Sequence, residues 1–186
     1  MRLFDMFKKK NNIDSNENKV NIITNNDINN NIESNRKIEG RYKFLNDIAN
    51  KTLYNGLSDS DINSYSQEFS ETFNIDLPDD VKDFLKATNG IYMNGETFFS
   101  KFNDDVKEKS PRATRKTKDI IGFNENYRDM TDIENYIILG KDSLSYYVYD
   151  IKSKKYQDIS NGTLVILNEY DEFAKMVEDV LTRDNI

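Results

Sequence analysis

The stretch that decides the fold of this chain is LPDDVKDFLKATNG, residues 77–90. Pro78 has no backbone N–H to leave unpaired, so it suits a helix start, and the two aspartates after it suit the positive end of the helix dipole. Val81, Phe84 and Leu85 recur at helical spacing and predict one buried face. The closing Asn-Gly pair tolerates the left-handed conformation that ends a helix. The stretch therefore predicts a short amphipathic helix with a defined start and stop.

Residues on the N-terminal side of this stretch predict two more helices. Apolar side chains recur at helical spacing over residues 45–53 and again over residues 62–73. An Asn-Gly pair ends the first helix. Ser58 or Ser60 is expected to cap the second, because a hydroxyl there accepts a free backbone N–H.

Residues on the C-terminal side change to a shorter, strand-like period rich in aromatic and β-branched side chains. The predicted strands cover residues 91–102, broken by a turn at Asn94-Gly95, then residues 136–139 ending at Gly140, residues 144–151, residues 156–159 and residues 164–167. Residues 153–155 are expected to form a hairpin turn. A short helix or turn is expected over residues 119–128, and a final helix over residues 173–181 with Asp171 as its N-cap.

Residues 1–39 differ from the rest of the chain in composition. They are rich in Asn, Lys, Ile and Ser, and their isolated apolar residues show little sustained period. Such a segment buries too little apolar surface to offset the entropy lost on ordering. We expect a flexible tail over residues 1–39 and a folded domain over residues 40–186.

The composition excludes several functions. The chain has no Cys and no His, which excludes disulfides, Cys- or His-based metal sites and Ser-His or Cys-His nucleophiles. No apolar run reaches the roughly 18 to 20 residues of a membrane span, and the short, charged start does not fit a signal peptide. We therefore expect a cytoplasmic protein with no membrane association.

The charge of the chain bears on its partners. A net charge of −7 and an isoelectric point near 4.8 argue against a nucleic-acid binder, which needs Lys and Arg to neutralise phosphates. Acidity suits a basic partner, although it also serves solubility. The basic stretch over residues 107–118 has no interleaved aromatic residues for base stacking, and we interpret it as a surface loop.

Carboxylate pairs are the remaining candidates for catalysis. Asp79 with Asp80 and Asp104 with Asp105 resemble acid–base or metal-holding pairs, but a helix start and a solvated loop explain them. Residues 59–63 begin like a calcium loop, yet the glycine and the bidentate acid that an EF-hand needs further on are missing. We predict no catalytic residue, no cofactor and no metal site.

Three residues of one predicted strand are candidates for partner binding. Tyr147 and Tyr149 share one face of the strand over residues 144–151, because side chains alternate along a strand. That face could be an exposed aromatic patch of the kind that protein interfaces use, or both faces could be core packed beneath helices. On the first hypothesis, Tyr147, Tyr149 and Asp150 are the partner-binding residues.

Four segments together resemble the SUKH superfamily, and within it the YrhA-like branch. The stretch at residues 77–90 is similar to the family's Leu-Pro, helix, Asn-Gly block. The other three are the middle segment IGFNENYR (residues 121–128), the paired strands YIILG (residues 136–140) and YVYD (residues 147–150), and YDEF (residues 170–173) with the last helix. The likeness covers about residues 58–182.

This resemblance implies an α+β fold, with a central, mostly antiparallel sheet flanked by helices, and no catalytic residues. Members of the superfamily are typically immunity proteins, encoded beside polymorphic toxins that they inhibit by direct binding. The expected function is to neutralise a cognate toxin domain, with a nuclease-type toxin as the preferred target. The alternative is an intracellular regulatory scaffold of the same fold. Neither nucleic acid nor a membrane is an expected partner.

Overall fold

A computed structural model describes residues 37–48, 53–101, 118–127 and 133–183. All of them belong to one unit that begins at Lys37, shortly before the predicted start of the domain. Ile38 is buried, and its backbone N–H and C=O bond the side chain of Asn46 at 2.9 and 2.7 Å. These contacts explain why the unit includes residues 37–39. The rest of the expected tail lies outside the described residues.

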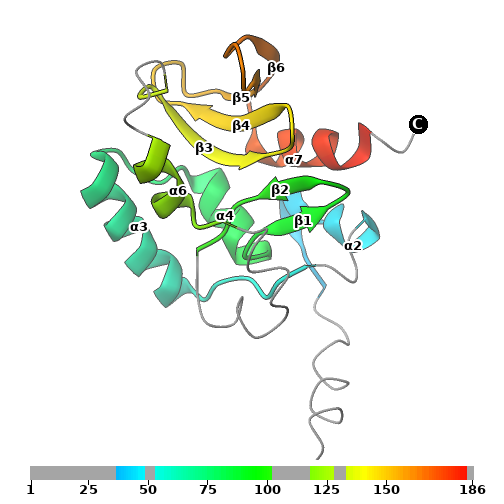
Figure 1. Cartoon of the computed structure of the whole chain (residues 1–186). Coiled ribbons are helices and arrows are strands. Elements are labelled where there is room, and N and C mark those ends of the chain that lie inside the picture. Colours follow the sequence, from blue (N-terminus) through cyan, green and yellow to red (C-terminus); the bar gives the residue numbers. More distant parts are fainter. Residues whose placement is uncertain (1–36, 49–52, 102–117, 128–132, 184–186) are drawn as a thin grey trace, which may run out of the picture. The chain divides into compact units, whose positions relative to one another are not determined.

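The described elements pass from helices to a sheet and back to a helix, as the sequence pattern predicts (Figure 1). In chain order they are the 3-10 helix η1 (Gly40–Tyr42), α2 (Leu45–Ile48), α3 (Asp59–Phe73), α4 (Asp79–Ala87), β1 (Ile91–Met93), β2 (Glu96–Phe98), α6 (Ile120–Tyr127), β3 (Tyr136–Lys141), β4 (Ser145–Asp150), β5 (Tyr156–Ser160), β6 (Ile166–Tyr170) and α7 (Phe173–Thr182). The expected α+β fold class is confirmed. None of the described helices has the length and apolar character that crossing a membrane requires.

The six described strands form one antiparallel sheet in the order β1-β2-β3-β4-β5-β6. Every strand pairs with its neighbour in the chain, so β1 and β6 are the two edges. Asn94 and Gly95 join β1 to β2 with φ of 52° and 96°, the left-handed pair that a two-residue hairpin requires. The β4–β5 hairpin turns over residues 151–155, where the sequence predicts a turn.

A neighbouring residue caps the start of α3, whereas a residue distant in the sequence caps the start of α7. Ser58 caps α3 by accepting the N–H of Asp61 at 3.2 Å, as predicted. The predicted cap of α7, Asp171, is wrong, because its carboxylate pairs with Lys155. The first N–H of α7, on Phe173, donates instead to Asp80 at 3.2 Å. A residue far back in the sequence thus fixes the start of the last helix.

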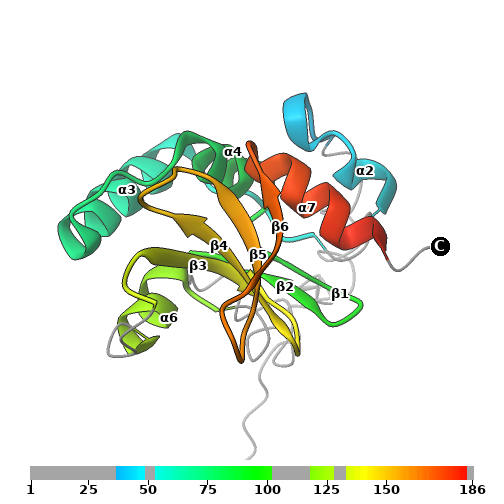
Figure 2. The same cartoon turned by 90° about the horizontal axis from the view of Figure 1, so that it is seen from above.

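Different helices cover the two faces of the sheet. Neighbouring residues of β4 point to opposite faces, so their contacts show what lies on each. On one face Tyr147 stacks on Phe98 with ring centroids 5.1 Å apart, and Phe98 packs on Phe173 of α7. On the other face Tyr146 lies 6.0 Å from Tyr127 of α6. Figure 2 shows α4 and α7 on one side of the sheet and α6 on the other. Both faces of β4 therefore contribute to the core.

Phe84 of α4 lies at the centre of the core. It is fully buried together with Val81 and Leu85, which confirms the predicted inner face of this helix. Its ring lies 5.6 Å from that of Tyr42 and 5.3 Å from that of Phe173. One aromatic side chain therefore joins the N-terminal segment, α4 and α7.

Gly140 lies inside β3, whereas the sequence suggested that the strand ends there. The strand continues to Lys141, and a bulge shifts its register on β4 after Ile138. A Cβ on Gly140 would lie 2.5 Å from the backbone oxygen of Thr97 and 3.0 Å from the ring of Tyr147. Only glycine lets β2 and β3 approach this closely.

Asn124 of α6 binds the helix to the sheet. Its buried side-chain amide donates to the carbonyl of Ile120 and to that of Ile138, both at 2.8 Å, and its oxygen accepts the N–H of Ile138 at 2.7 Å. These bonds satisfy backbone groups at the β3 bulge that would otherwise be costly to bury. They give a structural role to the Asn of the segment at residues 121–128.

Candidate functional site

Tyr147 is a core residue. Its side chain is 0 % exposed, and its hydroxyl donates a hydrogen bond to the buried carboxylate of Glu96. Burial, followed by this hydrogen bond, raises the pKa of Tyr147 well above its usual value, so the hydroxyl stays protonated. Of the two hypotheses for this face of β4, the exposed patch is wrong at Tyr147 and core packing is confirmed there, because the ring packs against Phe98 beneath α7.

Tyr149 and Asp150 are half-buried at the end of β4. The ring of Tyr149 lies 5.3 Å from that of Tyr156, and burial raises its pKa. The carboxylate of Asp150 accepts the N–H of Lys152 at 2.9 Å and the hydroxyl of Ser153 at 2.7 Å, which shapes the β4–β5 turn. These contacts are structural, and a role of Tyr149 and Asp150 in partner binding stays a prediction.

Asp79 and Asp80 do not converge on a shared site. The carboxylate of Asp79 is 92 % exposed and lies 2.9 Å from the ammonium of Lys82, whose hydrogen bond lowers the pKa of Asp79. Asp80 turns the other way, forms an ion pair with Arg41 and accepts the N–H of Phe173. The second pair, Asp104 with Asp105, lies outside the described residues.

The calcium-like residues at the start of α3 are engaged in other contacts. Asp59 lies 2.7 Å from the ammonium of Lys86, and Asp61 accepts the hydroxyl of Ser58 at 2.6 Å. The Ser58 bond is the main cause of a lowered pKa at Asp61. Within the described residues, no cluster of three or more carboxylates is placed to hold a metal ion. Both aspartates serve the helix start.

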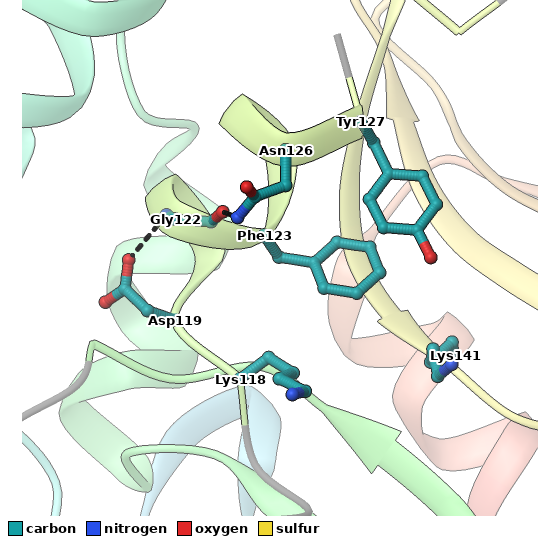
Figure 3. Close-up of a pocket in the computed structure, with 7 residues that line it drawn as sticks. All are labelled: Lys118, Asp119, Gly122, Phe123, Asn126, Tyr127 and Lys141. Carbon is teal, nitrogen blue, oxygen red and sulfur yellow. Dashed lines mark hydrogen bonds between the residues drawn. The ribbon is translucent and has the colours of Figure 1, made fainter. Parts of the chain in front are cut away.

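Figure 3 shows a pocket beside the start of α6, with a volume of about 490 Å³. Its lining consists of Lys118, Asp119, Gly122, Phe123, Asn126, Tyr127 and Lys141. Asp119 accepts the N–H of Gly122 at 2.9 Å, and the rings of Phe123 and Tyr127 stack with centroids 4.4 Å apart. The polar groups thus hold the helix start, and two lysines and a pair of stacked aromatic rings line the pocket.

An apolar patch at the β6 edge is the main exposed hydrophobic feature of the described residues. The members of this edge patch are Leu144, 72 % exposed, Val165, 58 %, Ile166, 49 %, and Leu167, 53 %. The N–H of Asn161 donates to the carbonyl of Leu144 at 2.9 Å, which places the β3–β4 turn beside the β5–β6 turn. Exposed apolar residues that gather in one place mark interaction surfaces more often than isolated ones do.

Acidic residues follow the edge patch along the chain. Residues 164–172 contain Glu169, Asp171 and Glu172 and neither Lys nor Arg. The sequence pattern of residues 164–167 predicts a strand but not an exposed surface. The signal was the unbroken apolar run at residues 164–167, which lacks the alternation of a strand with one face in water. Only the strand order shows that this run lies at an edge.

Comparison with known proteins shows the family. Residues 56–182 match the SMI1 / KNR4 family (SUKH-1), and the chain belongs to that family. The expected SUKH superfamily is thereby confirmed, whereas the YrhA-like branch stays a prediction. A crystal structure of a protein from Pseudomonas syringae pv. tomato has a similar fold, with a TM-score of 0.54 and 16% sequence identity over 75% of this chain and 95% of that one. No curated protein matches the chain significantly in sequence.

Proposed function

We propose that this chain is an immunity protein, which binds and neutralises a cognate bacterial polymorphic toxin by stoichiometric protein–protein interaction. Membership of the SMI1 / KNR4 family (SUKH-1) over residues 56–182 carries the proposal, because proteins of this superfamily are typically immunity proteins. A non-enzymatic role agrees with the absence of His and Cys. It also agrees with the separate structural contacts of Asp79 and Asp80.

A nuclease-type toxin is the preferred target. Residues 40–186 contain 19 Lys and Arg against 27 Asp and Glu, a net charge of −8. Nucleases need a basic surface to hold phosphates, so an acidic inhibitor is steered onto that surface and competes with the substrate. The proposed site of action is the cytoplasm, where such a toxin meets nucleic acid.

Titration of toxin activity tests this proposal. The protein encoded by the neighbouring reading frame is purified, and its activity is measured against rising amounts of the full chain. We expect inhibition to become complete at about one copy of the chain per toxin molecule. Association should slow as salt screens the charges. Complete inhibition at strongly substoichiometric amounts would show turnover and overturn the proposal. Failure to bind the neighbouring gene product, together with capture of several unrelated cellular proteins, would favour the regulatory scaffold.

A further inference from the structure

We propose that the outer edge of β6 receives an extended strand of the toxin, and that this strand carries basic residues among apolar ones. The inference rests on the proposed function and names the surface and the chemistry that would perform it. It adds a second candidate surface to the predicted Tyr149 and Asp150, since Tyr147 itself is buried.

The backbone of β6 is available for strand addition. Among the described strands, β6 pairs with β5 alone, through Tyr156↔Tyr170 to Ile159↔Ile166. A strand at a sheet edge leaves alternate N–H and C=O groups pointing outward, and an added strand can pair with them. The opposite edge, β1, spans three residues, Ile91–Met93, and none of them is exposed. β6 is therefore the edge that a partner can reach.

The residues of the edge favour pairing. Natural edges are commonly protected by charged side chains or Pro, and residues 164–168 contain neither. The pairs Asp158↔Asn168 and Ile159↔Ile166 leave Leu167 as the extra residue of a bulge within β6. Every residue from Val165 to Glu169 is exposed, so the exposure runs along the whole of this segment and is not confined to the bulge. The result is an open backbone edge with apolar side chains along it.

Charge selects the occupant. Asp171 pairs with Lys155, which balances its charge, whereas Glu169 accepts a hydrogen bond from the neutral amide of Gln157 at 3.0 Å and keeps its negative charge beside the edge. Glu172 follows in the same acidic segment. An incoming strand therefore finds apolar contacts at one end and fixed negative charge at the other. Its complement is a segment with apolar residues followed or preceded by Lys or Arg.

The same charges disfavour a second copy as occupant. Two β6 strands that pair antiparallel over their whole length, with the two-fold axis at Asn168, bring Val165 and Ile166 of one copy opposite the acidic end, Glu169 to Glu172, of the other. Apolar side chains would then cover carboxylates, and the opposing segment supplies no Lys or Arg. Burying a charge without a partner is costly. The edge suits a basic strand better than its own copy.

The test combines one double variant with a matched control. Val165→Lys with Leu167→Lys adds two positive charges to the edge at exposed positions. Asn63→Lys with Gln67→Lys adds the same charge to the exposed surface of α3. Each full-length variant is first checked for an unchanged unfolding transition. We expect the edge variant to bind the purified neighbouring toxin at least tenfold more weakly, and the control to bind within twofold of the unchanged chain. Equal binding by both variants would overturn the proposal.

A peptide probe separates this proposal from the proposed function. A synthetic Lys-Val peptide of about seven residues, with Val at one end and Lys at the other, is added to the full chain, and a peptide with Glu in place of Lys serves as its counterpart. We expect the Lys-Val peptide to slow hydrogen exchange of the backbone amides of residues 165–170, and to bind at least tenfold more tightly than the counterpart. Protection elsewhere, or binding without charge preference, would overturn the edge as the site.

Together, the toxin-binding and peptide-binding experiments distinguish failure of the proposed function from failure of the edge proposal. If the peptide protects β6 but the toxin does not bind the unchanged chain, the proposed function fails, and with it the toxin as the source of the strand. If the toxin is neutralised equally by the edge variant, the toxin binds elsewhere and the edge proposal fails alone. Sedimentation of the full chain tests the other occupant considered above, a second copy of the chain. A dimer that the edge variant dissociates would show that the edge binds a second copy.

Discussion

We expect Asp80 to stabilise the fold much more than its neighbour Asp79, although both lie in the first turn of α4. The carboxylate of Asp80 accepts the N–H of Phe173 at 3.2 Å and pairs with Arg41. That of Asp79 is 92 % exposed and contacts Lys82, three positions along the same helix. Replacing each aspartate in turn by alanine therefore compares a contact between distant elements with a local one.

The structure sets the size of the difference. Loss of a helix cap costs about 0.5–2 kcal/mol, and loss of the half-exposed Arg41 pair adds about 0.2–1 kcal/mol. Asp80→Ala should thus lower the free energy of unfolding by roughly 1–3 kcal/mol. Asp79→Ala loses an exposed pair worth about 0.3–0.5 kcal/mol. Both substitutions remove a similar interaction with the dipole of α4, which largely cancels in the comparison.

Chemical denaturation followed by circular dichroism measures both free energies under the same conditions. Asp80→Asn, which keeps an oxygen acceptor but loses the charge, should fall between the two alanine variants. A double-mutant cycle with Arg41→Ala should give a coupling below about 1 kcal/mol, so that most of the loss belongs to the α7 cap. If Asp79→Ala and Asp80→Ala proved equally costly, the bond from Phe173 would contribute little and the reasoning would fail.

Three further substitutions test the packing of the core by the same unfolding measurement. Gly140→Ala should cost roughly 1–3 kcal/mol, since its Cβ would meet a backbone oxygen at 2.5 Å; a cost near zero would show that β2 and β3 can separate freely. Phe84→Ala should cost roughly 3–5 kcal/mol and Pro78→Ala far less, because Pro at a helix start mainly restricts the unfolded chain; equal costs would contradict the assigned helix. Tyr147→Phe should cost about 1–3 kcal/mol, because buried Glu96 loses this donor; unchanged stability would show that the bond is not needed.

The sequence predicted the features that local chemistry determines. Ser58 at a helix start, the Asn94-Gly95 turn and the buried face around Phe84 each depend on residues within a few positions of one another, and the structure confirms all three. The cap of α7 depends on a contact between Asp80 and Phe173, which are 93 positions apart. No local sequence pattern predicts a hydrogen bond between residues so far apart.

The candidate site was harder to predict for a related reason. Periodicity shows that Tyr147 and Tyr149 share a face, but not what covers that face. The structure covers it with Phe98 and leaves Leu167 exposed at the end of the sheet. Whether a strand is central or at an edge depends on the order of all the strands, which a single strand does not encode.

The consecutive order of the strands also has a consequence for how the chain folds. From β3 to β6, each pairing closes a short loop, so this ladder can form quickly. Pairing β2 with β3 encloses residues 99–135 and should be slower. During synthesis the N-terminal helices and β2 leave the ribosome before the ladder exists. We therefore expect Phe84 and Phe98 to be only partly packed on the nascent chain, against each other and Tyr42, until β4 and α7 supply Tyr147 and Phe173.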